Sequence, residues 1–272
     1  MAQLTNPLDI FKLLDNSNCR QCGQSTCMAF AAAVFRGQQE LSECPKLDAE
    51  TVARFSTKTQ PQTSPDQEVE ETVKQLKKEI PKVDLAAAAK RLGGRYKNGK
   101  ITVKVLGKDF HVDSNGRLSA EIHTNAWVSV PVLTYILHGA GSNPIGKWVS
   151  FRELSQGKSW TGLFEQRCEK PLKKIADEHP DFFEDMLDMF SGRDGKDQFD
   201  ADVALILHPL PKVPLAICYW RAEEGLDSSL HVFFDATVED NLTMGSIFAL
   251  GAGLARMLEK LVQRHQPQAA MG

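Results

Sequence analysis

Four cysteines near the N-terminus have a spacing that is typical of metal binding. They occur in the segments NCRQCGQSTCMAF and SECP with the pattern C-x2-C-x4-C-x16-C, as Cys19, Cys22, Cys27 and Cys44. Thiolate sulfur is a ligand for both structural zinc and iron–sulfur clusters. The same residues could also form disulfides or pack separately as small apolar side chains. These four alternatives make different predictions about function.

The composition argues against a disulfide framework. Six cysteines in 272 residues are too few for a scaffold held together by disulfides. The N-terminus has no basic region followed by an apolar one, and the low-charge stretch 242–255 is too short to cross a bilayer. We therefore expect a cytoplasmic protein without membrane insertion, whose thiols stay reduced. The net charge of −3 and the lack of a basic tract predict no attraction to nucleic acid.

An iron–sulfur cubane suits the spacing better than zinc does. A structural zinc site commonly pairs two C-x2-C turns, whereas only Cys19 and Cys22 form such a turn, and no histidine precedes His111. In a cubane each thiolate approaches a different corner. Cys27 begins a predicted helix whose N-terminal N–H groups favour a thiolate, and Cys44 follows that helix. Zinc ligation and four separate buried thiols stay open as alternatives.

Apolar residues on the flanking segments are expected to shield such a cluster from water. The aromatic and aliphatic candidates are Phe11, Leu14, Phe30 and Phe35. Each of these residues taken alone is more typical of ordinary core packing. The two other cysteines, Cys168 and Cys218, each stand alone in an apolar segment, and we expect them to be structural.

The polarity of the chain divides it into two domains. Residues 56–68 are rich in Ser, Thr, Gln and Pro and predict a linker. We expect a small helical, cluster-binding domain over 1–55 and a larger domain over 69–272. In the larger domain, strands clustered between helices predict an α+β fold, with an antiparallel or mixed sheet and flanking helices.

Within the larger domain, three apolar runs bounded by Pro, Gly and Asp predict central strands at 202–210, 213–220 and 229–236. The alternating segment 100–118 predicts short antiparallel strands with two turns. Helices are expected over 67–80, 83–92 (with glycines past its end), 127–141, 159–179, 181–190 and 242–265, with Pro131 in the first turn of its helix. The ladder of Gly245, Ala249 and Gly253 would allow another element to approach the last helix closely.

The segment from Asn18 to Leu47, NCRQCGQSTCMAFAAAVFRGQQELSECPKL, resembles the four-cysteine domain of the corrinoid iron–sulfur protein that works with acetyl-CoA synthase. It is also similar to the domain in the cluster-bearing subunit of Rnf-type electron-transport complexes. The resemblance implies a low-potential [4Fe-4S] cluster with Cys19, Cys22, Cys27 and Cys44 as its ligands. Asp15 departs from the pattern, because relatives often have Pro there.

Residues from about Asp84 to Glu259 resemble the DUF3786 family, an uncharacterised domain often found behind this module in anaerobic microorganisms. The motifs are GKWVSFREL, FEQRCEKPL, LPKVPLAICYW and HVFFDAT. The family implies a shared fold and an anaerobic setting, but no reaction. Asp109 and His111 partly match a corrinoid-binding loop, although a hairpin histidine is the better interpretation because Ser114 replaces its glycine. Trp220 and Arg221 lie at the end of a predicted strand, a position where ligand-binding groups are often found.

These features favour an electron-transfer protein that carries one [4Fe-4S] cluster and exchanges single electrons with a redox partner, such as a corrinoid protein or ferredoxin. The alternative is an enzyme whose larger domain binds a substrate, flavin or corrinoid served by the cluster. A purely structural metal is the third hypothesis. The sequence assigns neither a reaction nor an oligomeric state.

Overall fold

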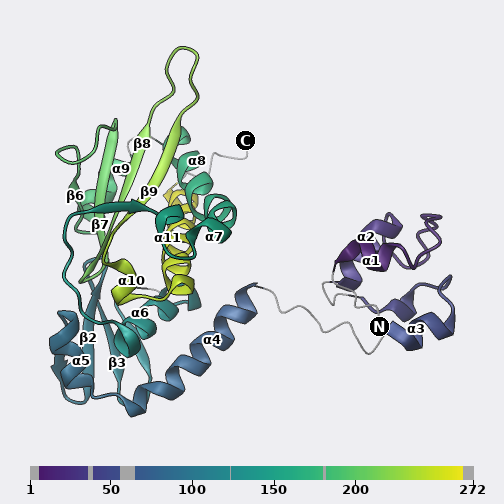
Figure 1. The fold of residues 1–272 in the computed structure, drawn as a ribbon, viewed down its shortest axis with the longest axis horizontal. Coiled ribbons are helices and arrows are strands. Elements are labelled where there is room, and N and C mark those ends of the chain that lie inside the picture. Colours follow the sequence, from purple (N-terminus) through teal and green to yellow (C-terminus); the bar gives the residue numbers. More distant parts are fainter. Residues whose placement is uncertain (1–5, 36–38, 56–64, 123, 180–181, 266–272) are drawn as a thin grey trace, which may run out of the picture. The chain divides into compact units, whose positions relative to one another are not determined.

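The computed structural model describes residues 6–35, 39–55, 65–122, 124–179 and 182–265 (Figure 1). The chain separates into two compact units, Met1–Glu68 (unit 1) and Val69–Gly272 (unit 2). Most of the segment predicted to be a linker, 56–64, lies outside the described residues. The last part of the predicted linker, 65–68, is helical, because it belongs to α4 (Pro65–Glu79). This helix begins at Pro65, and proline is favoured in a first helical turn.

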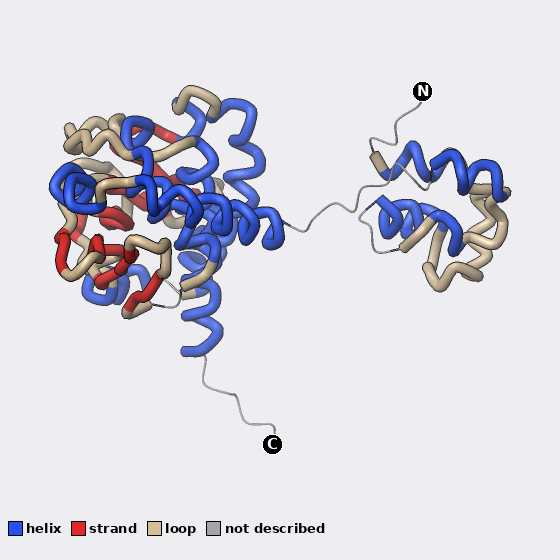
Figure 2. Tube along the Cα trace, turned by 90° about the horizontal axis from the view of Figure 1, so that it is seen from below, coloured by secondary structure: helices blue, strands red, loops and turns tan. Residues whose placement is uncertain are grey.

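Unit 1 is built from short helices and loops, and its described residues contain no strand (Figure 2). The elements are α1 (Pro7–Phe11), α2 (Cys27–Phe35), the 3-10 helix η1 (Leu41–Glu43) and α3 (Ala49–Phe55). Helix α1 starts at a capping box, in which Asn6 and Asp9 each accept the other's backbone N–H. The core of unit 1 contains Ile10, Phe30 and Leu41, whose side chains are almost completely buried.

Unit 2 begins with α4, the 3-10 helix η2 (Ile80–Lys82) and α5 (Leu85–Leu92). Helix α5 is capped at its start by Asp84 and ends at Gly93, whose φ of 73° suits glycine. An antiparallel sheet follows, in the order β1 (Arg95–Lys97), β2 (Lys100–Val105), β3 (Lys108–Asp113), β4 (Leu118–Ala120). The expected strands and turns of 100–118 are confirmed.

A second, five-stranded antiparallel sheet forms the centre of unit 2. Its order is β5 (Trp148–Ser150), β9 (Ser229–Asp235), β8 (Val213–Trp220), β7 (Val203–Leu210), β6 (Arg193–Asp194). The three predicted central strands are therefore confirmed as β7, β8 and β9. Their alternate residues face opposite sides, so one face joins the main core, while the other carries a smaller cluster around Ala204, Ala216 and Cys218.

The remaining helices of unit 2 surround the main core. They are α6 (Ala126–His138), the 3-10 helix η3 (Phe151–Glu153), α7 (Gly157–Phe164), the π-helix η4 (Glu165–Glu169), α8 (Lys170–Glu178), α9 (Phe182–Met189), α10 (Val238–Asn241) and α11 (Met244–His265). Helix α11 packs on α6 and η4. At Gly253 a Cβ atom would lie 3.0 Å from Trp127, so glycine does permit a close approach there, whereas Gly245 faces open space.

Two helices differ from the predictions. Pro131 lies inside α6 rather than in its first turn, because the Asn125 side chain accepts the Val128 N–H and starts the helix earlier. The expected helix 159–179 is interrupted by the π-helix η4, which ends two residues before Pro171, a residue that cannot donate a helical hydrogen bond. The α+β prediction is confirmed: a small helical unit precedes a unit with antiparallel sheets and flanking helices. Across the described ranges, no helix combines the length and apolarity needed to cross a membrane.

Candidate metal centre

The four N-terminal cysteines lie at the ends of helices and in the loop before α2. Cys27 is the first residue of α2, and Cys44 directly follows η1, where its N–H bonds to the Leu41 carbonyl. Both of these side chains are buried. Cys19 and Cys22 lie in the irregular loop 15–26 and are half-buried. Two thiols are thus fixed by helices and two belong to a segment without regular structure.

The backbone of this loop turns repeatedly into the left-handed region. The φ angles are 59° at Asn16, 49° at Asn18, 63° at Arg20 and 79° at Gly23. Asparagine and glycine tolerate this conformation, whereas arginine adopts it rarely. Three of the four left-handed positions therefore carry a residue type that suits them, and Arg20 is the exception.

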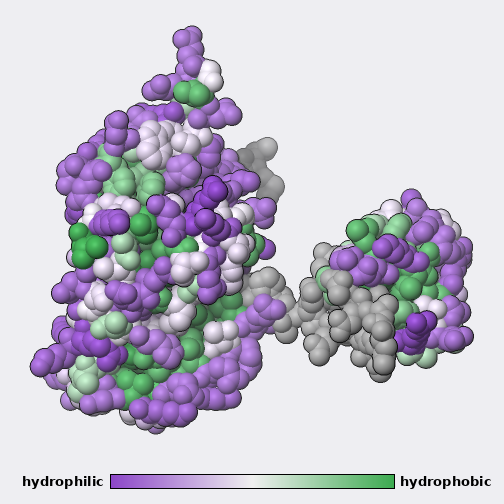
Figure 3. Space-filling view, in the orientation of Figure 1, coloured by the Kyte–Doolittle hydropathy of each residue, from purple (hydrophilic) through white to green (hydrophobic). Residues whose placement is uncertain are grey.

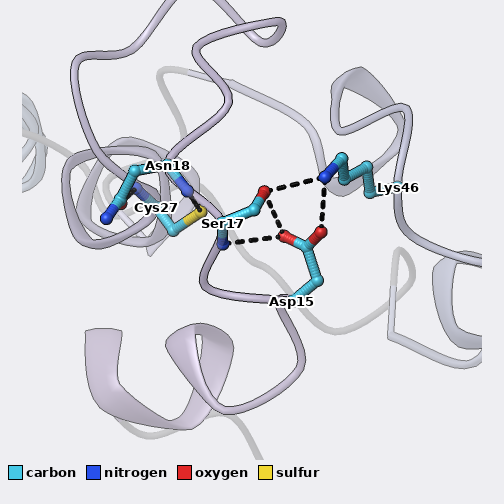
Figure 4. Close-up of polar contacts among 5 residues, drawn as sticks. All are labelled: Asp15, Ser17, Asn18, Cys27 and Lys46. Carbon is cyan, nitrogen blue, oxygen red and sulfur yellow. Dashed lines mark hydrogen bonds and ion pairs between the residues drawn. The ribbon is translucent and has the colours of Figure 1, made fainter.

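Asn18 connects the loop to the start of α2. The Cys27 N–H donates to Asn18 Oδ1 at 2.7 Å, and the Asn18 N–H donates to Cys27 Sγ at 3.3 Å (Figure 4). Asn18 thereby holds the sulfur and satisfies the N–H of the first residue of α2, while Thr26 accepts the Ala29 N–H at the start of the helix. The tendency of asparagine to adopt positive φ is the signal in the sequence for Asn18.

A polar network lies on the other side of the loop. The Lys46 ammonium contacts Asp15 at 2.8 Å and donates to the Ser17 hydroxyl at 2.9 Å, while Ser17 donates to Asp15 at 2.9 Å (Figure 4). The pKa of the Cys19 thiol is lowered by a hydrogen bond from the Gln21 backbone, by Ser17 and by the Lys46 charge. Lys46 also interacts electrostatically with Cys27. The lysine therefore supplies a positive charge close to two of the four thiols.

Three of the thiols share the apolar core of unit 1. Cys27 and Cys44 are members of its buried cluster, and Cys22 packs against it. All four residues expected to shield a metal centre belong to the same cluster: Leu14 and Phe30 are buried in it, and Phe11 and Phe35 pack on it. An apolar surrounding of this kind restricts water and is one of the factors that set cluster potential.

The thiols are not gathered into a closed coordination group. In the part of the chain that the structure describes, no three His, Cys, Asp or Glu side chains converge closely enough to hold a metal ion. Nevertheless, the residues around the thiols fit an iron–sulfur cluster in character. They provide N–H groups directed at sulfur, a nearby cation and an apolar cover. These are the surroundings that stabilise a cluster with cysteine ligands.

The other two cysteines are isolated and buried, as expected. Cys168 lies in the π-helix η4, and burial raises its pKa well above the ordinary value. Burial raises the pKa of Cys218, in strand β8, to about 12. A thiol whose pKa is raised stays protonated and is a poor metal ligand. Both cysteines therefore serve the packing of unit 2.

The partial match to a corrinoid-binding loop is not supported by the local structure. His111 lies in the middle of strand β3, where its Nδ1 is 2.8 Å from the Thr102 hydroxyl. Asp109 forms ion pairs with Arg95 at 2.8 Å and with Lys104 at 2.9 Å. The segment is a strand of a hairpin, in agreement with the interpretation that was favoured from sequence.

Comparison with protein families gives two matches. Residues 84–257 match the family described as "Domain of unknown function (DUF3786)". Residues 14–46 match the family described as "Putative Fe-S cluster", and this range contains all four N-terminal cysteines. No solved structure matches the chain at a significant level.

The similar curated proteins are gamma subunits of the acetyl-CoA decarbonylase/synthase complex. That of Methanopyrus kandleri is 40% identical over 55 residues, which are 20% of this chain and 12% of the relative. The subunits of Methanosarcina acetivorans and Methanocaldococcus jannaschii are 40% and 38% identical over 45 and 48 residues, each 10% of the relative. The chain thus spans about a tenth of the length of these relatives. Their methanogen sources fit the expected anaerobic setting.

The two family matches follow the division of the chain into two units. The iron–sulfur match falls within unit 1 and covers the cysteine loop, α2 and η1. The larger match extends from the cap of α5 into α11, which is most of unit 2 and more than half of the chain. The protein is therefore an iron–sulfur protein that belongs to the DUF3786 family.

Proposed function

We propose that Cys19, Cys22, Cys27 and Cys44 hold one [4Fe-4S] cluster, and that the protein transfers single electrons to or from a partner protein. The observation that carries this proposal is the environment of the thiols. Three of them share the apolar core of unit 1, while the fourth, Cys19, lies where hydrogen bonds and the Lys46 charge lower its pKa. The hydrogen bonds and the Lys46 charge favour the thiolate of Cys19, and the apolar core restricts water around the other three thiols.

Different residues of the chain would supply the ligands of such a centre, orient a sulfur atom and cover its apolar side. Cys27 and Cys44 are held by α2 and η1, and the loop 15–26 would supply Cys19 and Cys22. Asn18 directs an N–H at the Cys27 sulfur. Leu14 and Phe30 cover the apolar side. A bound [4Fe-4S] cluster supplies a one-electron couple, at a potential between about −700 and +450 mV depending on its surroundings.

The partner we propose is a redox protein, either a corrinoid protein or a ferredoxin. The similar proteins named above are subunits of a multi-subunit complex, so the module that they share with this chain works beside other proteins there. A cluster in a small unit of its own presents its ligand loop close to the surface, because Cys19 and Cys22 are only half-buried. Short distances to the surface are what electron exchange between proteins requires.

An anaerobic reductive titration tests electron transfer directly. The full-length protein, reconstituted with iron and sulfide, is titrated with dithionite while its visible absorbance and EPR spectrum are followed. We expect uptake of about one electron per chain, with a paramagnetic signal that disappears when an equivalent of oxidised ferredoxin or methyl viologen is added. A protein that contains iron and sulfide but takes up no electron over the accessible range would instead have a structural cluster.

A further inference from the structure

A surface cavity of about 500 Å³, open to solvent, lies at the end of strands β8 and β9 in unit 2. Trp220 and Arg221 line it from the end of β8, Ser229 and His231 from β9, and Asp202 from the residue before β7. The connection between β8 and β9 adds further lining residues and projects beyond the rest of the unit (Figure 1). Small-molecule sites in proteins commonly have volumes of about 300–1,000 Å³. The size of this cavity suits an organic ligand.

The walls of the cavity are fixed by hydrogen bonds in the protein. The Arg221 backbone N–H donates to Asp202 at 2.7 Å, and the Trp220 indole N–H donates to the Asp200 carbonyl at 2.7 Å. In the connecting segment, Glu223 and Leu226 exchange two backbone hydrogen bonds at 3.1 and 3.0 Å. A site whose walls are held in this way is preformed, so a ligand loses less free energy in ordering it.

Trp220 and His231 give the cavity an aromatic wall. Their ring centroids are 5.9 Å apart, with the planes inclined at 58°. Because the Trp220 N–H is already bonded to the protein, this side chain offers a ligand its ring surface rather than a hydrogen bond. The aromatic row continues under the sheet face, from His231 to Phe233 and on to Phe199 and Trp148, with centroid separations of 5.4–6.4 Å. Such a wall suits a flat ring system.

Charged groups of both signs surround the aromatic wall. His231 Nδ1 lies 3.8 Å from Glu169, and this carboxylate raises the pKa of the imidazole. Glu169 is placed there by the π-helix η4, a type of element that is frequent at functional sites. Arg221 is the cation of the cavity, and Asp202, Glu223 and Asp227 line it as acceptors. The surface of the projecting segment is mainly hydrophilic (Figure 3), apart from Leu226, which is 70% exposed.

The mixture of charges narrows the class of ligand. A simple anion would be repelled by the carboxylates of Asp202, Glu223 and Asp227, and a simple cation by Arg221. A purely apolar ligand would desolvate these charged groups without pairing them. Planar nitrogen heterocycles have both donors and acceptors along their edges and a face that stacks on indole. We propose that this cavity binds a planar nitrogen heterocycle, such as a flavin, a pterin or a nucleobase, stacked against Trp220.

This proposal is independent of the cluster, so it is tested on the full-length protein by isothermal titration calorimetry with three probes. Riboflavin, biopterin and guanosine, each up to 1 mM, distinguish the three sources of the same chemistry. We expect one probe to bind saturably at one site per chain. Trp220→Leu should weaken that binding about tenfold, since stacking on one aromatic residue contributes roughly 1–3 kcal/mol.

Two variants separate recognition from folding. Trp148→Leu is the matched control, because Trp148 lies at the other end of the aromatic row, donates to Gln198 and does not line the cavity. We expect its affinity to equal that of the unmodified protein. Arg221→Gln keeps the backbone hydrogen bond to Asp202 and should weaken binding at least threefold, with an unchanged circular dichroism spectrum. Absence of saturable binding of all three probes, or equal losses in the two tryptophan variants, would overturn the proposal.

Discussion

The positive charge of Lys46 should control the reduction potential of the cluster. Its ammonium is held by Asp15 at 2.8 Å and by Ser17 at 2.9 Å, and it interacts electrostatically with Cys19 and Cys27. Reduction adds one negative charge to the cluster, so a nearby cation stabilises the reduced state. Lys46→Met should therefore make the potential more negative. Asp15→Asn, which removes the opposing charge, should make it more positive.

The structure also sets the size of the expected shift. Lys46 and Asp15 have side-chain exposures of 38% and 37%, so water screens them partly and an effective dielectric constant of about 40 is appropriate. For an assumed separation on the order of 8 Å, Coulomb's law at that value gives a shift of roughly 40 mV for one electron. We expect shifts of this order with opposite signs in the single variants, and a potential close to that of the unmodified protein in the double variant.

An anaerobic redox titration followed by EPR measures these potentials. Lys12→Met provides the control, because Lys12 is an exposed lysine of the same unit that follows α1, and it should change the potential by much less. Iron content must be equal in all variants for the comparison to hold. A potential that rises in Lys46→Met, or that shifts no more than in Lys12→Met, would refute the role of Lys46.

Three further predictions concern unit 2. Gly251→Ala should lower the free energy of unfolding by about 2 kcal/mol, because the new Cβ would lie 2.6 Å from the buried Phe164 ring. Gly245 faces open space, so Gly245→Ala should not lower the free energy of unfolding. Urea unfolding compares the two variants. Asp235→Asn should cost about 2 kcal/mol at pH 7. Burial raises the pKa of Asp235, but the hydrogen bonds that its carboxylate accepts outweigh burial and lower the pKa. The stabilisation by the carboxylate is therefore present above about pH 4 and is lost as the pH falls through the lowered pKa. The free energy of unfolding measured at pH 3 and at pH 7 tests this dependence. Glu169→Gln should lower the pKa of His231, whose imidazole NMR signals report it; an unchanged titration would exclude Glu169 as the cause.

The central strands of unit 2 could be predicted because their signals are local. Strands β7, β8 and β9 are continuous apolar runs that end at proline, glycine or aspartate, and such runs have few other arrangements. The start of α6, which places Pro131 inside that helix, follows from the local cap Asn125, a signal that the apolar pattern of 127–141 does not use. The π-helix η4 packs against α11, a long-range contact that local patterns do not contain.

The candidate site divides in the same way. The four cysteines are recognisable from their spacing, and the residues that cover them from their apolar side chains. Both signals are visible because these residues lie close together in the sequence. The contact of Lys46 with Asp15 joins residues on either side of α2, and no periodicity predicts it. The cavity in unit 2 likewise forms only when strand pairing brings His231 beside Trp220 and Asp202. Long-range contacts of this kind come from the fold.

The measurement that tests the central proposal most directly is iron, acid-labile sulfide and zinc per chain in anaerobically purified protein. Cys44→Ala removes a proposed ligand, and Cys218→Ala removes a buried thiol of unit 2 as the matched control. We expect about four iron and four sulfide per chain in the unmodified protein and in Cys218→Ala, with loss of both in Cys44→Ala. About one zinc and no sulfide in the unmodified protein would contradict a [4Fe-4S] centre and identify a zinc-binding unit instead.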